Sequence, residues 1–472
     1  MNRVFENTSA LLAAHLVTRL FSLGVTFLLM TRYFGEKEMG VYFLAISFTN
    51  LIATVIELGM HTPLIREMTL RLNEARHFVG NALIIRILLS IAAYGLMVGV
   101  GRLLGYPAAT MQIIKLLGLA EILNLIALSY RCVFRAFEQM KYEAYTVIAE
   151  RTVVCVVGGA LIVLGGSLQE FCLVILIAGC MNLALSVAFA RWKFVGLRFR
   201  FDLHIWAVLM RQALPFALGN MLHLVYFRIG AIMLEKLSPD GIVANAWYGL
   251  AHTIVNAVTI LPGAFLGAMF PLMSRAFEND RSEFRAAYTY ATRWMVLLGL
   301  PTAVGIAALA WEIVSILPAD KYDPESVAPA LQLLSWSCGL AFLTTTSITV
   351  LRAADKRVQF TLLMGMTTFV NVALNYLLIP RYSHVGAATS LIVSEGFLFL
   401  AGFVYISRRI ATLTGMRYAI KAVVLSATMG CGLIVLRKLA PIWVLIPLSV
   451  MYYAAGMVFL GELKRDTFKQ IL

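Results

Sequence analysis

Apolar residues fill the chain in long runs that are broken by charged residues, proline and glycine. A helix that crosses a membrane needs about 20 consecutive residues of mainly apolar character. Runs of this length recur from one end of the chain to the other and give fourteen candidate spans. These spans are 8–31, 41–60, 79–100, 110–130, 144–165, 171–190, 213–234, 243–273, 289–311, 327–351, 358–379, 386–407, 418–436 and 441–461. The pattern predicts an all-α, polytopic membrane protein.

The composition supports this interpretation. Of 472 residues, 60% are hydrophobic and 14% are charged, against roughly 45–50% and 25% in soluble domains. This excludes a soluble enzyme and a disordered chain. The longest predicted connection, from Arg191 to Gln212, is short, and the chain has no GxxxxGK[ST] motif. We therefore expect neither an ATPase nor a large module outside the membrane.

The charge of the connections predicts an orientation. The net charge is +14, and Lys and Arg concentrate on the cytoplasmic side of membrane proteins. With both termini cytoplasmic, the basic clusters all lie inside, which predicts a multi-pass membrane protein in this orientation. The positive charge then faces anionic lipid headgroups rather than nucleic acid. The clearest clusters are Arg191, Lys193, Arg198 and Arg200, and Arg408, Arg409, Arg417 and Lys421.

An internal repeat divides the chain. The pattern G-x6-Y-x-L-A-x-[ST]-x-x-N occurs at 35–50 and again at 241–256, an offset of 206 residues. The two copies are offset by six helices, so both have the same orientation. Parallel repeats of this kind are typical of transporters whose site lies between two bundles. We expect six-helix lobes at 1–212 and 213–410, and two additional helices with a cytoplasmic tail at 411–472.

The cysteines and the N-terminus carry no sign of other chemistry. All six cysteines lie in or beside apolar runs, without a CxxC pair or a histidine at metal-ligand spacing. We expect no metal site, no catalytic residue and no cofactor. His15 and Arg19 interrupt the first apolar run, and no small-residue cleavage site follows it. The first helix is therefore expected to remain rather than to be removed as a signal peptide.

Polar residues follow one face of several spans. Steps of three and four residues place them in stripes on spans 1, 2 and 8, since each residue turns a helix by about 100°. We expect polar residues of these stripes and of span 7 to line a substrate cavity. The candidates are His15, Arg19, Asn50, His223, Arg228, Tyr248, His252 and Asn256.

Each polar residue also has a purely structural interpretation. Asn50, Asn256, Asn371 and Asn375 are equally suited to hydrogen bonds between helices, and the histidines to neutral buried positions as well as to proton relay. Glu57 and Arg86 lie near the cytoplasmic ends, where snorkelling or a gate pair is the alternative. Glu150 and Arg151 point about 100° apart. We expect that they do not both face one cavity and that one of them pairs with another helix.

The arginines suggest the charge of the cargo. A guanidinium binds two phosphate oxygens at once and keeps its charge at any accessible pH. Arg19 and Arg228 in a cavity therefore favour an anionic substrate. Glu57, Glu121 and Glu395 are candidates for cation coupling to a Na⁺ or H⁺ gradient, or for counter-ions.

Three diffuse motifs carry a resemblance to a known family. They are R-Y-F-G-E-K-E-M-G-V-Y at 32–42 with Glu57-Leu-Gly59, Leu261-Pro262 with F-P-L-M-S at 270–274, and N-V-A-L-N-Y-L-L-I-P at 371–380 with V-G-A-A-T at 385–389 and Glu395. The chain resembles the polysaccharide (O-antigen type) flippases of the multidrug, oligosaccharidyl-lipid and polysaccharide (MOP) exporter superfamily. It departs from them at Gly230, where family members often carry an acid.

The resemblance implies a function. Such proteins use two lobes in alternating access to carry polyprenyl-pyrophosphate-linked oligosaccharide to the outer leaflet for surface polysaccharide biosynthesis. Arg19 and Arg228 would then hold pyrophosphate or acidic sugars, and a polymerase and glycosyltransferases would be partners. The alternatives are a cation-coupled multidrug antiporter of the same superfamily, an integral-membrane glycosyltransferase or polymerase, and an assembly partner that transports nothing. Cavity arginines would repel cationic drugs, and no outer loop has the size that an enzyme usually needs.

Overall fold

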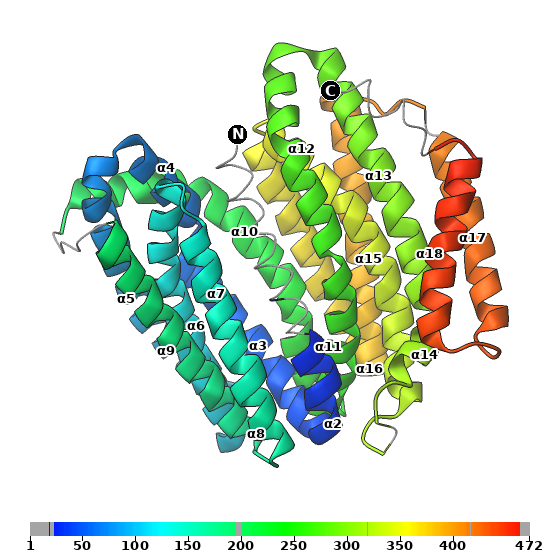
Figure 1. The fold of residues 1–472 in the computed structure, drawn as a ribbon, viewed down its shortest axis with the longest axis horizontal. Coiled ribbons are helices and arrows are strands. Elements are labelled where there is room, and N and C mark those ends of the chain that lie inside the picture. Colours follow the sequence, from blue (N-terminus) through cyan, green and yellow to red (C-terminus); the bar gives the residue numbers. More distant parts are fainter. Residues whose placement is uncertain (1–17, 19–22, 195–200, 319, 416, 463–472) are drawn as a thin grey trace. The chain divides into compact units, whose positions relative to one another are not determined.

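A computed structural model describes the chain except residues 1–17, 19–22, 195–200, 319, 416 and 463–472. The described residues form helices and no strands (Figure 1). They fall into two compact units, Met1–Ile232 and Met233–Leu472. The boundary lies inside helix α10, twenty residues beyond the predicted boundary between the lobes. The division at 1–212, 213–410 and 411–472 stays a prediction.

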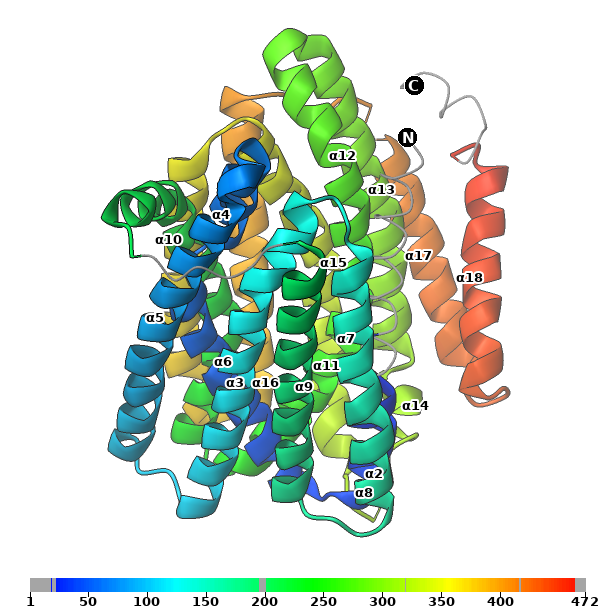
Figure 2. The ribbon, with the colours of Figure 1, turned by 60° about the vertical axis from the view of Figure 1, so that its left-hand side comes forward.

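The first unit is built from antiparallel helices joined by short turns. Its helices are η1 (Leu23–Met30), α2 (Thr31–Tyr33), α3 (Glu36–Glu57), α4 (His61–Leu70), η2 (Leu72–Glu74), α5 (Ala75–Leu103), α6 (Ala108–Ala136), α7 (Lys141–Val153), η3 (Val154–Gly158), α8 (Gly159–Val163), α9 (Leu168–Lys193) and most of α10 (Leu203–Leu237). The segments η1 and η3 are π-helical. The first turns of α10 run across α5 rather than along it (Figure 2). The predicted loop 191–212 is therefore partly helical.

Local sequence explains where these helices begin and how closely they pack. The carboxylate of Glu170 accepts a hydrogen bond from the Ser167 amide (2.7 Å), and Ser167 Oγ accepts one from the Glu170 amide (3.3 Å). This capping box satisfies amides that the first turn of α9 leaves unpaired. Gly179 on α9 lies against the backbone of Ala120 on α6. Small residues at such contacts let helix backbones approach within a membrane.

The second unit is a separate bundle. Its helices are α11 (Gly241–Val258), α12 (Ile260–Asn279), α13 (Arg281–Ala308), α14 (Ala310–Val314), α15 (Pro324–Ala353), α16 (Arg357–Arg409), α17 (Arg417–Leu436) and α18 (Ile442–Phe459). Gly299 on α13 and Gly339 on α15 lie at the close contact between these two helices. The last two helices lie side by side at one edge of this unit (Figures 1 and 2). Leu433 on α17 and Leu445 on α18 share a core cluster with Leu309, the residue that directly follows α13.

Helix α16 is a hairpin of two antiparallel arms. Ser383 has φ 49° and ψ −131°, which is not helical, and Pro380 just before it lacks an amide proton. Asn371 Nδ2 donates to Ser394 Oγ (3.2 Å), although 23 residues of straight helix would separate them by about 34 Å. A Cβ on Gly386 would lie 2.5 Å from the backbone oxygen of Leu378. The predicted spans 358–379 and 386–407 are confirmed as these arms.

The helices agree with a multi-pass membrane protein. Twelve helices in the described part of the chain are long and apolar enough to cross a membrane. The hairpin α16 is counted once among them. The first predicted span, 8–31, lies largely outside the described residues, so the count agrees well with the predicted fourteen. The predicted span 243–273 is a run of two helices, α11 and α12, that meet at Thr259.

The internal repeat marks equivalent helix starts. Gly35 precedes the first residue of α3, and Gly241 is the first residue of α11. The repeated apolar positions are buried in both copies, with Leu44 and Leu250 fully inaccessible to solvent. Packing of one helix into the core of its own unit therefore explains the Y-x-L-A part of the motif.

Candidate functional site

A polar cavity of about 220 Å³ lies inside the first unit. Helices α3, α6, α7 and α9 surround it, together with the π-helical segments η1 and η3. Its polar lining comes from Tyr42, Thr49, Asn50, Glu121, Asn124, Glu150 and Arg151. Charged side chains within a membrane bundle are costly and commonly mark a substrate or ion pathway. We take this cavity as the candidate site and name it the α3/α6/α7 cavity.

Glu150 is held in place by neutral amides. Its Oε1 accepts a hydrogen bond from Asn124 Nδ2 (3.1 Å), and its Oε2 accepts one from Asn182 Nδ2 (2.8 Å). Asn182 also donates to Asn124 Oδ1 (2.8 Å). Glu150 is 3% exposed and Asn182 is fully buried. Both carboxylate oxygens are therefore engaged, and this acid ties together α6, α7 and α9.

Glu121 and Arg151 face the same cavity without such partners. Within the described part of the chain, the Glu121 carboxylate makes no hydrogen bond or ion pair, and it is only partly buried. Arg151 Nε is buried and has no hydrogen-bond partner among the described residues. These two side chains are the charged groups of the cavity that remain able to meet a ligand.

The expectation that Glu150 and Arg151 do not both face one cavity is wrong. Both line it, together with Val154 and Cys155 of η3. Positions 150 to 155 of the lining cover an arc of about 140° at 100° per residue, so the cavity follows the helix surface far enough to include both. The expectation that one of the two pairs with other helices is confirmed by Glu150.

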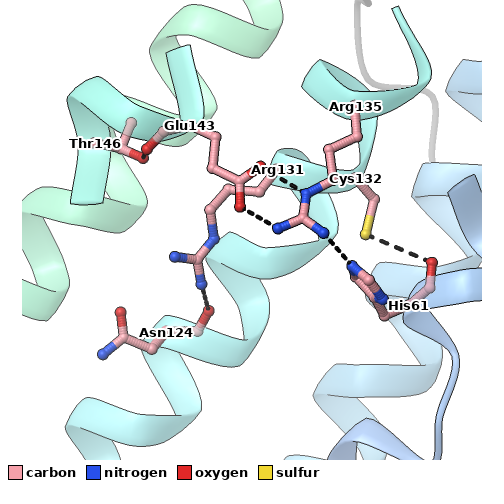
Figure 3. A network of polar contacts seen from close by, with 7 residues as sticks. All are labelled: His61, Asn124, Arg131, Cys132, Arg135, Glu143 and Thr146. Carbon is pink, nitrogen blue, oxygen red and sulfur yellow. Dashed lines mark hydrogen bonds and ion pairs between the residues drawn. The ribbon is translucent and has the colours of Figure 1, made fainter. Parts of the chain in front are cut away.

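A second polar cluster continues from the cavity along α6. Arg131 Nη2 donates to the carbonyl of Asn124 (3.1 Å). One turn further, Arg135 binds both carboxylate oxygens of Glu143 on α7 at 2.6 and 2.7 Å. Arg135 Nη1 also lies 2.8 Å from His61 Nε2, at the start of α4 (Figure 3). Arginine has only donors, so His61 accepts this hydrogen bond and is neutral. The cluster joins α4, α6 and α7.

Buried polar groups also occur in the second unit. Glu395 Oε2 accepts a hydrogen bond from Thr344 Oγ1 (2.9 Å), which joins α16 to α15. Asn375 Nδ2 donates to Asn371 Oδ1 (2.9 Å), and Asn371 bonds Ser394 across the hairpin. The structural interpretation, as a group that bonds between helices, is therefore confirmed for Asn371. The bond from Asn375 stays within one arm of α16.

The polar stripe predicted on span 8 forms contacts within α11. The rings of Tyr248 and His252 stack with centroids 5.7 Å apart and 19° between their planes. A hydrogen bond of 2.7 Å joins Asn256 Nδ2 and His252 Nδ1. Spacing of four residues brings such side chains together on one helix face. Tyr248 and His252 are buried, and Asn256 is partly buried.

The remaining predicted site residues are placed as follows. His15 and Arg19 lie outside the described residues. Asn50 and Glu121 come together in the α3/α6/α7 cavity. His223 and Arg228 are partly buried on α10, and Glu57 is the last residue of α3. Their predicted roles in substrate binding and coupling stay predictions.

Sequence reasoning missed Asn124, which lines the cavity, and Asn182, which binds Glu150 behind it. A usable signal was present on α6, where Glu121, Asn124, Arg131 and Arg135 follow at steps of three, seven and four residues and so share one face. On α9, the only such signal for Asn182 among the described residues that bond it along the helix is Ser186, four residues further on. In the described residues, no group of three or more His, Cys, Asp or Glu side chains is arranged to hold a metal ion.

Comparison with known proteins identifies the family. A family model described as a polysaccharide biosynthesis protein matches residues 4–277, more than half of the chain. The chain belongs to the polysaccharide biosynthesis protein family. A second model, MatE, matches residues 215–377. A membrane protein of Methanocaldococcus jannaschii, described as uncharacterized, is 29% identical over 174 residues. That alignment covers 34% of this chain and about a third (32%) of the relative's length.

Solved structures share the fold of this family member. The lipid II flippase MurJ, in an inward closed conformation, matches 96% of this chain and 98% of its own chain with a TM-score of 0.74 and 14% identity. A multidrug resistance MATE family transporter of the MOP superfamily, in an inward-facing conformation, matches 84% of this chain and 94% of its own chain, with a TM-score of 0.67 and 14% identity. A MOP superfamily transporter from Pyrococcus furiosus matches 85% of this chain and 93% of its own chain, with a TM-score of 0.55 and 14% identity. The chain therefore has the MOP transporter fold.

Proposed function

We propose that this protein is a flippase that carries polyprenyl-pyrophosphate-linked oligosaccharide from the inner to the outer leaflet by alternating access. Membership of the polysaccharide biosynthesis family supports a role in surface polysaccharide assembly. The proposed location is the bacterial inner membrane, with both termini cytoplasmic, where a polymerase and glycosyltransferases would be its partners. The transporter fold supports a carrier rather than an enzyme.

The extent of the fold match carries the proposal. The match to the lipid II flippase leaves 4% of this chain uncovered. Helices α17 and α18 hold 20 and 18 residues, which together exceed that remainder, so the match extends into this C-terminal pair. The MATE match leaves 16% uncovered, so it can be reached without any residue of this pair. The match that must include C-terminal helices therefore favours the flippase over the second candidate, a cation-coupled multidrug antiporter.

The substrate's phosphates would be bound by arginine. Arg19 and Arg228 are the proposed ligands for pyrophosphate or acidic sugars, because a guanidinium matches two phosphate oxygens. Nothing in the sequence provides a nucleotide site to drive the cycle. An ion gradient or the membrane potential is therefore the proposed energy source.

Glu121 is the proposed coupling acid. Glu150 in the same cavity already accepts hydrogen bonds at both oxygens, so a change in its protonation would break contacts among three helices. Glu121 has no such contacts in the described part of the chain and faces the cavity. It can gain and lose a proton, or a bound cation, without that cost. Glu57 and Glu395 would then act as counter-charges rather than as the coupling site.

A reconstituted assay tests the transport proposal. The full chain is placed in liposomes that contain a fluorescent polyprenyl-pyrophosphate oligosaccharide, and an impermeant quencher reports the label in the outer leaflet. We expect faster redistribution than in liposomes without protein, and faster still under a proton gradient. Redistribution at the protein-free rate, with uptake of a cationic dye instead, would favour the antiporter.

Glu121→Gln provides the test of coupling, with Glu150→Gln as its matched control. Glu121→Gln should abolish the response to the proton gradient and leave the unfolding midpoint near that of the unmodified chain. Glu150→Gln should lower the unfolding midpoint, because it weakens the contacts to Asn124 and Asn182. A full response to the proton gradient in Glu121→Gln would contradict the assignment of Glu121 as the coupling acid. If only a Na⁺ gradient accelerates lipid redistribution by the unmodified chain, the coupling ion is Na⁺ rather than the proton.

A further inference from the structure

Glu57 and Arg86 lie at the same level of two packed helices. Ile56 on α3 shares a core cluster with Ala93 on α5 and with Leu89, which packs against that cluster. Beyond α3, Met60 shares another cluster with Ile85. The two helices therefore run antiparallel, and position 57 of α3 meets the part of α5 that carries Arg86.

Arg86 is a fully buried charge with neutral partners. It is 0% exposed, so the interpretation that it snorkels toward water is wrong. Its Nη1 donates to the carbonyl of Leu125 (2.8 Å) and to Ser129 Oγ (2.7 Å). Its Nε and Nη2 are buried and have no hydrogen-bond partner in the described part of the chain. A buried charge without a counter-charge is strongly unfavourable.

Glu57 is an unpaired acid in an unfavourable position. It is the last residue of α3, where the partial negative charge of the helix dipole disfavours a carboxylate. Among the described residues it forms no hydrogen bond or ion pair, and it is partly exposed. Each of these two side chains therefore lacks what the other would supply.

The turn that follows Glu57 has the properties of a hinge. Leu58 adopts φ 42° and ψ 26°, a left-handed conformation that costs a non-glycine residue of order 1–3 kcal/mol. Gly59 follows with φ 67°. A Cβ on Gly59 would meet the backbone of Ala213 and Ala217 at 3.5 Å, so this turn touches α10. Helix α10 is the element that continues from the first unit into the second.

We propose that Glu57 and Arg86 form an ion pair in one state of the transport cycle and separate in the other, with Leu58–Gly59 as the hinge. In the structure described here the pair is open. Rotation at the hinge turns Glu57 toward α5, gives Arg86 its counter-charge and relieves Leu58. The movement reaches α10 through Gly59. This inference rests on the proposed transport function, and it identifies Arg86 as a positioning residue rather than a substrate ligand.

The test compares Glu57→Gln, Arg86→Gln and the double variant with the unmodified full chain in lipid nanodiscs. Hydrogen–deuterium exchange of the peptide across Leu58–Gly59 reports the hinge without any substrate, and the liposome assay reports transport. We expect each single variant to change the exchange rate of this peptide at least fivefold and the double variant to match the stronger single one. Transport should follow the same non-additive order.

A matched control uses the neighbouring buried acid Glu67, which binds Gln212. The effects of Glu67→Gln and Arg86→Gln should multiply, because these residues share no contact. If Arg86→Gln fails to fold, Arg86→Lys replaces it, because it keeps the positive charge. Adding Glu57→Gln to Arg86→Lys should then still change the exchange rate of the peptide across Leu58–Gly59. Independent, multiplying effects of Glu57→Gln and Arg86→Gln on exchange would overturn the ion pair. Coupled exchange without lipid transport would retain the ion pair and reject the flippase function.

Discussion

The Arg135–Glu143 contact provides a quantitative test of the first unit. Glu143→Gln keeps the shape of the side chain and removes its charge. The acid is 6% exposed and Arg135 is 24% exposed, and both carboxylate oxygens accept from the guanidinium. Breaking a fully buried pair costs about 3–5 kcal/mol. Single hydrogen bonds between membrane helices contribute less, about 0.6 kcal/mol on average. In the variant, Arg135 also keeps its contact with His61. We therefore expect a loss of about 2 kcal/mol.

The assay is equilibrium unfolding of the purified protein in mixed micelles with increasing SDS. The matched control is Glu74→Gln, which removes another Arg–Glu contact, with Arg71 at 3.8 Å and both side chains more than half exposed. Surface pairs of this kind contribute about 0–1 kcal/mol. Equal losses in Glu143→Gln and Glu74→Gln would show that the buried cluster does not hold α4, α6 and α7 together.

Four further predictions concern the second unit. Gly386→Ala should cost about 3 kcal/mol or more in SDS unfolding, because its Cβ would overlap the backbone of the opposite arm at 2.5 Å. Gly432→Ala, whose Cβ meets nothing within 4 Å, should gain up to about 1 kcal/mol. Asn371→Ala should cost about 0.6–2 kcal/mol in the same assay, because it removes one hydrogen bond between the two arms and one bond from Asn375 within the first arm. Hydrogen bonds from Ser282 lower the pKa of Asp280 at the start of α13. The stability that Asp280 contributes is therefore present above the pKa of the unfolded carboxyl and is lost as the pH falls through the pKa of the folded one. In thermal melting curves measured at decreasing pH, Asp280→Asn should remove this part of the decrease in melting temperature.

Hydrophobic runs predicted the membrane fold well, for a physical reason. Lipid-facing and buried helix positions are both apolar, so each span is visible in the sequence whatever its neighbours are. The hairpin of α16 was predicted as two spans because Pro380 and the polar residues after it interrupt the run. The division of 241–279 into α11 and α12 was missed, since Thr259 does not break the apolar pattern.

The candidate site was predicted only in part. Periodicity places a residue on one face of a helix, but it does not specify which helix lies opposite or at what depth. Asn50 and Glu121 were therefore proposed separately, and their common cavity emerged only from the packing of α3 against α6. Asn182 shares its helix face with Ser186, but its role depends on Glu150 of another helix. For Arg86, snorkelling toward water was one of the alternatives left open by the sequence, and the structure encloses this side chain against α6.

The central claim is that this chain moves lipid-linked oligosaccharide across the membrane. The most direct measurement is the leaflet distribution of polyprenyl-pyrophosphate oligosaccharide in cells that lack the protein, probed with an impermeant glycosidase or lectin, before and after the protein is restored. We predict that the carrier accumulates in the protected inner leaflet and becomes exposed when the protein returns. Normal outward exposure in cells that lack this protein and any second exporter would contradict the claim.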